Sequence, residues 1–227
     1  MILAYQRIKL FDLIKIGFGI FTIILLIFIN GCKKEDNKTN DPKTFPEGDI
    51  VLDVLFADIE EFKYIHPGYS AGAGSGAPWG FEHLGLDFIT VTNGAKVLAP
   101  AGGVVEEVNI YMNPRNNQWQ VNVRVKYNED FIYHILFEPR APSEDEIALQ
   151  RAAIPISVGK KVAEGELLGT ILDLSHGDMS GGEAGIHFDL RKNEELVCPG
   201  NYFTLDALEE MLALLWAMYP QAKICYP

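Results

Sequence analysis

The chain has 227 residues, a length that suits one domain with short additional segments. Hydrophobic residues make up 48% of it, enough for a buried core, and the formal net charge is −12. An acidic surface disfavours nucleic acid as a partner, because phosphate binding needs clustered lysine and arginine side chains. We therefore expect no nucleic-acid partner.

The first 31 residues are typical of a secretory signal. Basic residues precede an uncharged apolar run at 16–29, which is shorter than the roughly 20 residues that a membrane span needs. A basic flank, an apolar stretch and a small-residue exit describe a signal peptide. The exit, Ile29-Asn30-Gly31-Cys32, resembles the bacterial lipobox, in which the cysteine is acylated and becomes the mature N-terminus. Residues 1–31 are thus predicted to be a lipoprotein signal peptide. An uncleaved anchor helix is the alternative.

Residues 32–48 are predicted to be a flexible tether that begins at the lipidated Cys32. They are polar, charged and proline-bearing, so they cannot bury enough apolar surface to fold alone. The expected location is the cell envelope, on the periplasmic or outer surface, with the membrane as a partner through the lipid anchor.

Two further cysteines, Cys198 and Cys225, remain once Cys32 is assigned to lipid. An extracytoplasmic compartment permits disulfides. We predict a Cys198–Cys225 disulfide that staples the last helix to the body of the protein; two buried thiols are the alternative.

The remainder of the chain reads mainly as strands. Residues 49–82 form an irregular lead-in whose segment 69–80 is rich in Gly, Ala and Ser, typical of a mobile loop beside a site or of a simple connector. Alternation of apolar and polar residues in 104–111 and 119–127 predicts strands with one buried face. Short β-rich runs predict strands at 88–91 and 96–99, and mostly apolar runs predict strands at 131–137 and 167–174. Helices are expected at 143–153, with a Ser143–Glu146 capping box, and at 204–219, with Thr204 as the N-cap and Pro220 as the stop.

A weak internal repeat lies within this β-rich region. Residues 94–97 and 103–105 are similar to residues 159–162 and 165–169, and in both copies a glycine turn precedes each strand. The doubling resembles the hybrid-motif β-sandwich that lipoyl-type carriers share with some metallopeptidases. A carrier needs a modifiable lysine at a hairpin tip, where this chain has Ala101-Gly102-Gly103. The predicted fold is mainly β, an antiparallel β-sandwich of duplicated-hybrid-motif type with a C-terminal α-helix.

Three residues have the types and spacing of a zinc site. His83 and Asp87 are four residues apart, and Gly85 lets the chain bend so that both side chains reach one ion. His187 lies in Gly185-Ile186-His187-Phe188-Asp189, where alternate residues of a strand share a face. Three protein ligands with an open fourth position are the usual arrangement of catalytic zinc.

These motifs, together with Ile132-Tyr133-His134-Ile135, occur in the order found in a known family. The region 83–190, about half the chain, resembles the lysostaphin-type (LytM-like) zinc endopeptidases, whose pattern is His-x-x-x-Asp, Tyr-x-His-Leu and His-x-His-Phe-Glu. The resemblance implies zinc bound by His83, Asp87 and His187. It implies a catalytic role for His134, although the tyrosine is one residue nearer than in the family. It also implies hydrolysis of peptidoglycan peptides. The metallopeptidase-like domain is predicted at 83–203, followed by a C-terminal helix and tail at 204–227.

One position departs from the family pattern. The first histidine of His-x-His is Gly185 here, and losing a positioned acid or base typically costs about 10²–10⁴ in rate. One hypothesis is that Glu183 or His176 supplies the missing group. His66, which lies in a turn sequence, is expected to be inert. Three functions remain open: an active zinc endopeptidase, a catalytically impaired zinc- or wall-binding regulatory domain, and a structural lipoprotein. The metal content of the protein would distinguish the structural lipoprotein from the other two.

Overall fold

The computed structural model describes residues 46–68, 70–71, 82–91, 93–114, 116–177 and 183–226. The predicted signal peptide, the predicted lipidation site Cys32 and most of the predicted tether and of the Gly-rich segment lie outside these residues. In the part of the chain that is described, no helix is long and apolar enough to cross a membrane. The fold below is that of the compact unit that contains residues 45–227.

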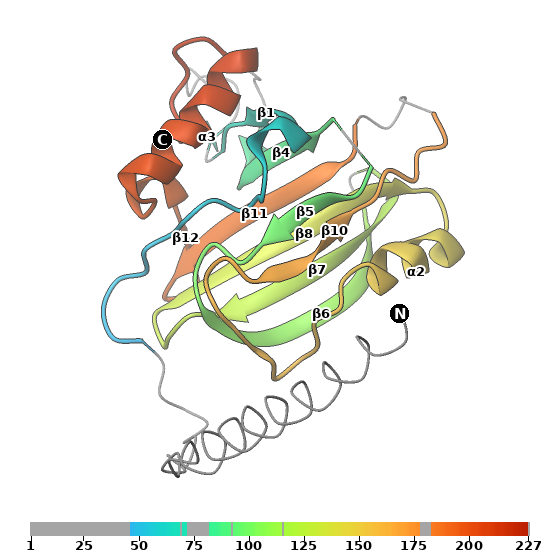
Figure 1. Cartoon of the computed structure of the whole chain (residues 1–227), viewed down its shortest axis with the longest axis horizontal. Coiled ribbons are helices and arrows are strands. Elements are labelled where there is room, and N and C mark those ends of the chain that lie inside the picture. Colours follow the sequence, from blue (N-terminus) through green and yellow to red (C-terminus); the bar gives the residue numbers. More distant parts are fainter. Residues whose placement is uncertain are drawn as a thin grey trace, which may run out of the picture. The chain divides into compact units, whose positions relative to one another are not determined.

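An antiparallel sheet forms the body of this unit (Figure 1). Its strand order is β1-β4-β11-β8-β7-β6-β9, with β12 paired to β11. The predicted mainly β fold is confirmed, and β1 adds an edge strand from the lead-in that the sequence pattern did not reveal. The strands are β1 (Phe62–His66), β4 (Leu86–Thr90), β6 (Gly103–Asn113), β7 (Gln118–Lys126), β8 (Phe131–Ala141), β9 (Lys161–Val162), β11 (Gly185–Lys192) and β12 (Glu195–Val197).

The internal repeat forms two interlocked ladders. Strand β5 (Ala95–Leu98) pairs with β10 (Leu167–Ile171), and β6 pairs with β9, so each strand of one copy pairs with a strand of the other. Gly94 and Gly159 hold equivalent places with φ of +91° and +85°, a left-handed conformation that favours glycine. Their N–H groups donate to Ile171 O and Val105 O. The glycines of the repeat are therefore explained by turn geometry.

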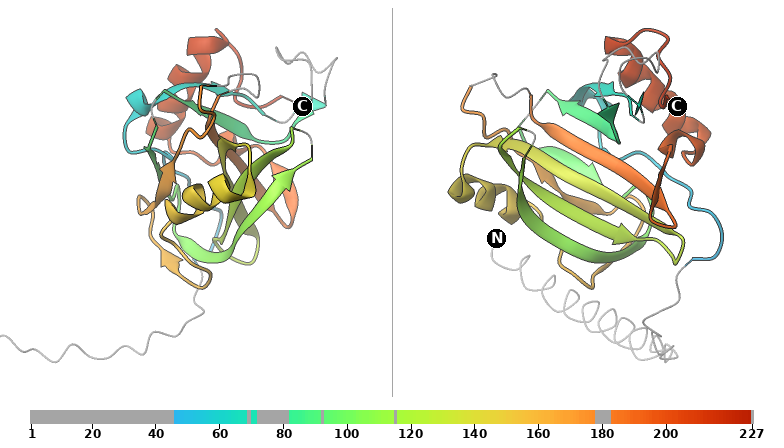
Figure 2. Two further views of the ribbon diagram at one scale, coloured as in Figure 1. Left: turned by 90° about the vertical axis from the view of Figure 1, so that its right-hand side faces the viewer. Right: turned by 180° about the vertical axis from the view of Figure 1, so that it is seen from behind.

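The large sheet has two chemically different faces. Along β8, Tyr133, Ile135 and Phe137 are fully buried, whereas His134, Leu136 and Glu138 between them are only partly buried. Directly paired residues point to the same side, so the alternation extends across β7, β11 and β4. The sheet curves, and the apolar face packs with β5 and β10 in one core (Figure 2). The candidate metal ligands Asp87 and His187 lie on the polar face.

Within the described residues, two α-helices and two 3₁₀ turns accompany the strands. Helix α2 (Glu144–Ala152) begins at Ser143, whose side chain accepts from Glu146 N, and α3 (Leu205–Met218) begins at Thr204, whose side chain accepts from Ala207 N. Both predicted N-caps are thus observed. The remaining elements are η1 (Ile59–Glu61), η3 (Pro199–Asn201), β2 (Ser70–Ala71) and β3 (Glu82–His83), with β2 paired to β3.

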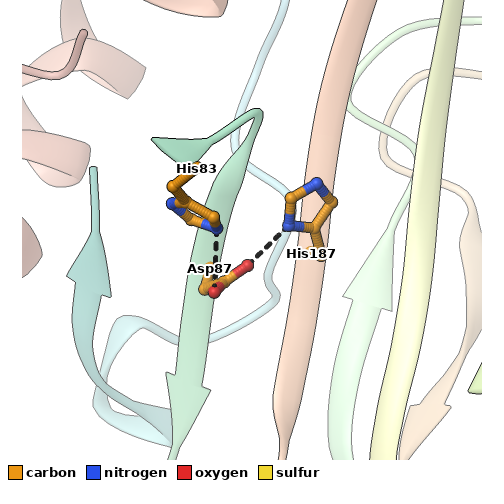
Figure 3. A group of neighbouring side chains, drawn as sticks. All are labelled: His83, Asp87 and His187. Atoms are coloured by element: carbon orange, nitrogen blue, oxygen red, sulfur yellow. Dashed lines mark hydrogen bonds and ion pairs between the residues drawn. The ribbon is translucent and has the colours of Figure 1, made fainter. Parts of the chain in front are cut away.

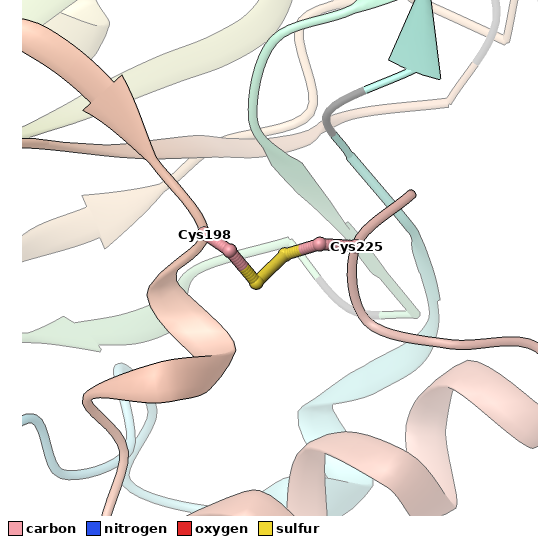
Figure 4. Close-up of a disulfide and its surroundings, with 2 residues drawn as sticks. All are labelled: Cys198 and Cys225. Atoms are coloured by element: carbon pink, nitrogen blue, oxygen red, sulfur yellow. A yellow bond between two sulfur atoms is a disulfide. The ribbon is translucent and has the colours of Figure 1, made fainter. Parts of the chain in front are cut away.

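A disulfide bond attaches the C-terminal segment to the rest of the fold. Cys198 and Cys225 form a disulfide across a sequence separation of 27 residues (Figure 4). Cys225 also pairs as an isolated parallel bridge with Gly68, on the segment that follows β1. The disulfide therefore connects the end of the chain to the segment after β12, and the bridge to Gly68 connects it to the segment after β1.

We expect the Cys198→Ser/Cys225→Ser variant to lose about 3 to 4 kcal/mol of unfolding free energy, the loop-closure value for a loop of this length. Urea denaturation of the oxidised protein and the variant, followed by circular dichroism, measures the difference. Ser143→Ala, which removes only a helix cap, provides a smaller reference loss of about 1 kcal/mol. An unchanged midpoint in the double variant would contradict the structural role of the disulfide.

Candidate metal centre

The predicted ligands His83, Asp87 and His187 meet on the polar face of the sheet (Figure 3). Asp87 in β4 lies directly opposite His187 in β11 in the antiparallel ladder. His83 ends β3, four residues before Asp87. One ligand atom from each residue lies within 4.8 Å of the others, and this is the one such group of three or more within the described ranges.

Both imidazoles are directed at the carboxylate. His187 Nδ1 lies 2.6 Å from Asp87 Oδ1, and His83 Nε2 lies 3.0 Å from Asp87 Oδ2. His83 Nδ1 donates to Pro67 O at 2.8 Å, which leaves Nε2 as the ligand atom of the neutral ring. A backbone carbonyl that fixes the tautomer of a histidine is a common second-shell feature of metal sites.

The charges of these groups are strongly perturbed. Burial disfavours the charged form of Asp87, but the hydrogen bonds and charges of His187 and His83 outweigh burial and hold the pKa of Asp87 well below its usual range. Burial likewise opposes the charge on His187, yet Asp87 raises the pKa of His187 to about 9. In the metal-free protein at neutral pH, a proton on His187 therefore balances the buried carboxylate.

Glycines create the space for the histidine rings. A side chain at Gly85 would place its Cβ 2.3 Å from His187 Nε2, and one at Gly68 would place it 2.1 Å from Gly85 O. Both distances are below any normal contact, so the segment after β1, the β3–β4 turn and the His187 ring are stacked without intervening side chains. Two imidazoles, one carboxylate and a glycine-lined cradle fit a zinc ion with an open coordination position.

The three ligands line a cavity of about 500 Å³. Its wall includes the guanidinium-bearing Arg140 and Arg191, the amide-bearing Asn113 and Asn116, and the acidic Glu138. The cavity is thus rich in groups that hydrogen-bond to peptides.

Glu138 is a residue that sequence reasoning missed. It lies on β8 directly opposite Gly185, and its carboxylate accepts a hydrogen bond from Gln120 Nε2 at 2.6 Å. Burial, followed by the negative charge of Asp87, raises the pKa of Glu138 to about 7. The signal available in the sequence was its position four residues after His134, which places both on one face of the strand.

His134 lies away from the predicted ligands. It pairs with Asp189, whereas Leu136, two residues further along β8, pairs with His187. His134 is not among the residues that line the cavity. Burial lowers the pKa of His134, and the charges that act on it come first from Asp189 and Arg191. The geometry therefore separates His134 from the three ligands by one row of the sheet.

The two hypothesised substitutes for the missing histidine are engaged elsewhere. The Glu183 carboxylate accepts from Lys63 Nζ at 2.8 Å and from Tyr64 OH at 2.7 Å. His176 is exposed and bonds to Glu146 at the start of α2. Neither lines the cavity that contains the predicted ligands.

Crowding around Gly185 bears on the departure from the family pattern at this position. A Cβ at Gly185 would lie 2.5 Å from Phe88 O, so a histidine at this position needs a shift of β4 or β11.

His66, which the sequence analysis expects to be an inert turn residue, ends β1 opposite Asp87. Its Nδ1 bonds to Tyr219 OH at 2.5 Å, and burial lowers the pKa of His66. His66 therefore lies beside the candidate metal centre and bonds to Tyr219, the C-cap residue of α3.

No protein-family model matches the sequence, and a comparison with curated proteins finds no match. Among solved structures, the chain is similar to a zinc-containing peptidase from Vibrio cholerae, with 16% identity, a TM-score of 0.42 and coverage of 65% of this chain and 38% of that one. It is also similar to Helicobacter pylori Csd3 in a hexagonal crystal, with 15% identity, a TM-score of 0.46 and coverage of 72% and 36%.

An orthorhombic crystal of Csd3 gives 15% identity, a TM-score of 0.45 and coverage of 76% and 42%. The chain therefore spans 36 to 42% of the length of these proteins. What the fold and the site define is a mainly antiparallel β protein with one candidate His-Asp-His metal centre in its described residues.

Zinc binding at pH 7 is expected to release about one proton, because the proton held on His187 by Asp87 must leave before the ring can bind a metal. Isothermal titration calorimetry in buffers of different ionisation enthalpy measures this release. The pKa of His187 is raised, so the affinity for zinc should increase with pH and level off above about 9. The exposed variant His176→Ala should release the same proton. Binding without proton release would contradict the assigned charge state.

Proposed function

We propose that this protein is a lipid-anchored, zinc metallopeptidase-like protein of the cell envelope that hydrolyses peptide bonds in peptidoglycan. The observation that carries the proposal is the convergence of His83, Asp87 and His187 in one cavity. Two nitrogens and one carboxylate with an open side match the ligand set of catalytic zinc. The substrate and the lipid anchor rest on the sequence motifs.

Each of these residues has a distinct part in the proposed reaction. His83, Asp87 and His187 would hold the ion, and Pro67 O fixes the ring of His83. When bound, zinc supplies Lewis acidity that polarises a peptide carbonyl and lowers the pKa of a bound water towards about 7. Arg140 and Arg191 line the same cavity and can bind the carboxylates and carbonyls of a peptide.

A second function, binding of wall peptide without cleavage, is favoured by one observation. The family's first histidine is Gly185, and the close approach of Gly185 to Phe88 O leaves no room for a side chain. If nothing replaces that histidine, the site can hold zinc and peptide and act as a regulatory or binding module.

Zinc-loaded full-length protein should release soluble muropeptides from purified peptidoglycan, and Asp87→Ala should abolish the release because it removes the carboxylate ligand. Chromatography of the soluble fraction measures the products. His176→Ala, which changes an exposed residue away from the cavity, should behave as the wild type. Sedimentation of the protein with peptidoglycan without product release would support the binding function, and neither binding nor release would contradict both.

Cys32 should be the site of acylation, since it follows the lipobox-like sequence. Metabolic labelling with a radioactive fatty acid should label the wild type and not Cys32→Ala. Cys198→Ser, which removes a disulfide cysteine, serves as the matched control and should retain the label. A label that persists in Cys32→Ala would exclude this anchor.

A further inference from the structure

The position of Glu138 relative to the candidate metal centre suggests a role for it. His187 lies directly opposite Leu136, and Gly185 lies directly opposite Glu138. Glu138 is thus the diagonal cross-strand neighbour of His187, a spacing of about 7 to 8 Å that long side chains can bridge. Because Gly185 has no side chain, nothing on β11 at this row separates Glu138 from the cavity that it lines.

A hydrogen-bonded chain from two adjacent strands fixes the carboxylate. Tyr111 OH in β6 donates to Gln120 Oε1 at 2.5 Å, and Gln120 Nε2 in β7 donates to Glu138 Oε1 at 2.6 Å. Gln120 is fully buried, so both ends of its amide need partners. Among the described residues, no hydrogen bond engages the second oxygen of Glu138, Oε2. One oxygen is therefore anchored, and the other can take a proton.

The electrostatic neighbours of Glu138 place it beside the centre. The charges of Asp87, His187 and His83 all act on Glu138, whereas those that act on His134 come from Asp189, Arg191, Arg124 and Glu107. Glu138 is nevertheless not part of the three-residue ligand group. It lines the same cavity as the three candidate ligands without being one of them.

We infer that Glu138 is the general base and general acid of this site, in the place where the family pattern has a histidine. The inference rests on the proposed peptidase function. Glu138 Oε2 accepts a proton from the attacking water as the new C–O bond forms. The same proton then passes to the amide nitrogen as the C–N bond breaks, so that an amine and a carboxylic acid leave, the acid loses its proton to solvent, and Glu138 returns to its initial state.

Glu138→Gln in the full-length protein tests this role, because glutamine keeps the shape and can still accept from Gln120 through its oxygen. Zinc affinity, measured by chelator competition, and affinity for a fluorescent stem peptide, measured by anisotropy, should stay within about threefold of the wild type. Peptide hydrolysis should fall by about 10²–10⁴. Glu129→Gln, a change of an exposed carboxylate away from the cavity, should cleave at the wild-type rate.

The outcomes separate the two proposals. Hydrolysis by both the wild type and Glu138→Gln at equal rates would overturn the role of Glu138 and leave the peptidase function intact. Loss of zinc from Glu138→Gln would overturn the role as well, since it would make Glu138 a ligand or a structural residue. Absence of cleavage by the zinc-loaded wild type would overturn the peptidase function, and the role of Glu138 with it.

Discussion

The ion pair between Asp87 and His187 is the interaction on which the candidate site depends. The two residues are direct partners in the β4–β11 ladder, so the same backbone hydrogen bonds that hold the sheet also set the distance between carboxylate and imidazole. A partly buried carboxylate needs compensating charge or hydrogen bonds, and here the two histidines supply both. Two of the three candidate ligands therefore lie on paired strands of the large sheet, which are more rigid positions than loops.

Close backbone packing around the site also constrains glycines, which have no functional side chain. Gly68 packs against Gly85, and Gly85 packs against the His187 ring, with no room for a Cβ at either position. Gly185 is similarly confined by Phe88 O. The same closeness that orients the candidate metal ligands therefore leaves no room for a histidine at position 185 unless β4 or β11 shifts. In our interpretation, a proton-transfer group could be supplied only from the neighbouring strand, where Glu138 lies.

The sequence predicted much of this arrangement and missed specific parts of it. Alternation in 119–127 predicted a strand with one buried face, because successive side chains of a strand point to opposite faces. The helix caps at Ser143 and Thr204 were visible as local patterns. Register was not visible, since it arises from pairing between distant segments. Motif similarity thus assigned His134 to the site, while Glu138, His66 and strand β1 became evident only from the β8–β11 and β1–β4 pairings.

The disulfide also constrains the candidate site, in addition to stabilising the fold as a whole. Cys225 pairs with Gly68, whose N–H donates to Ile224 O and whose carbonyl accepts from Tyr226 N. The preceding carbonyl, Pro67 O, holds Nδ1 of His83. A covalent bond to Cys198 thus fixes a backbone segment that is one residue from the group orienting a predicted metal ligand. Since outer-shell partners typically change metal affinity by about 10- to 100-fold, an oxidising compartment would favour both the folded C-terminal segment and the ordered ligand, which is consistent with the proposed envelope location.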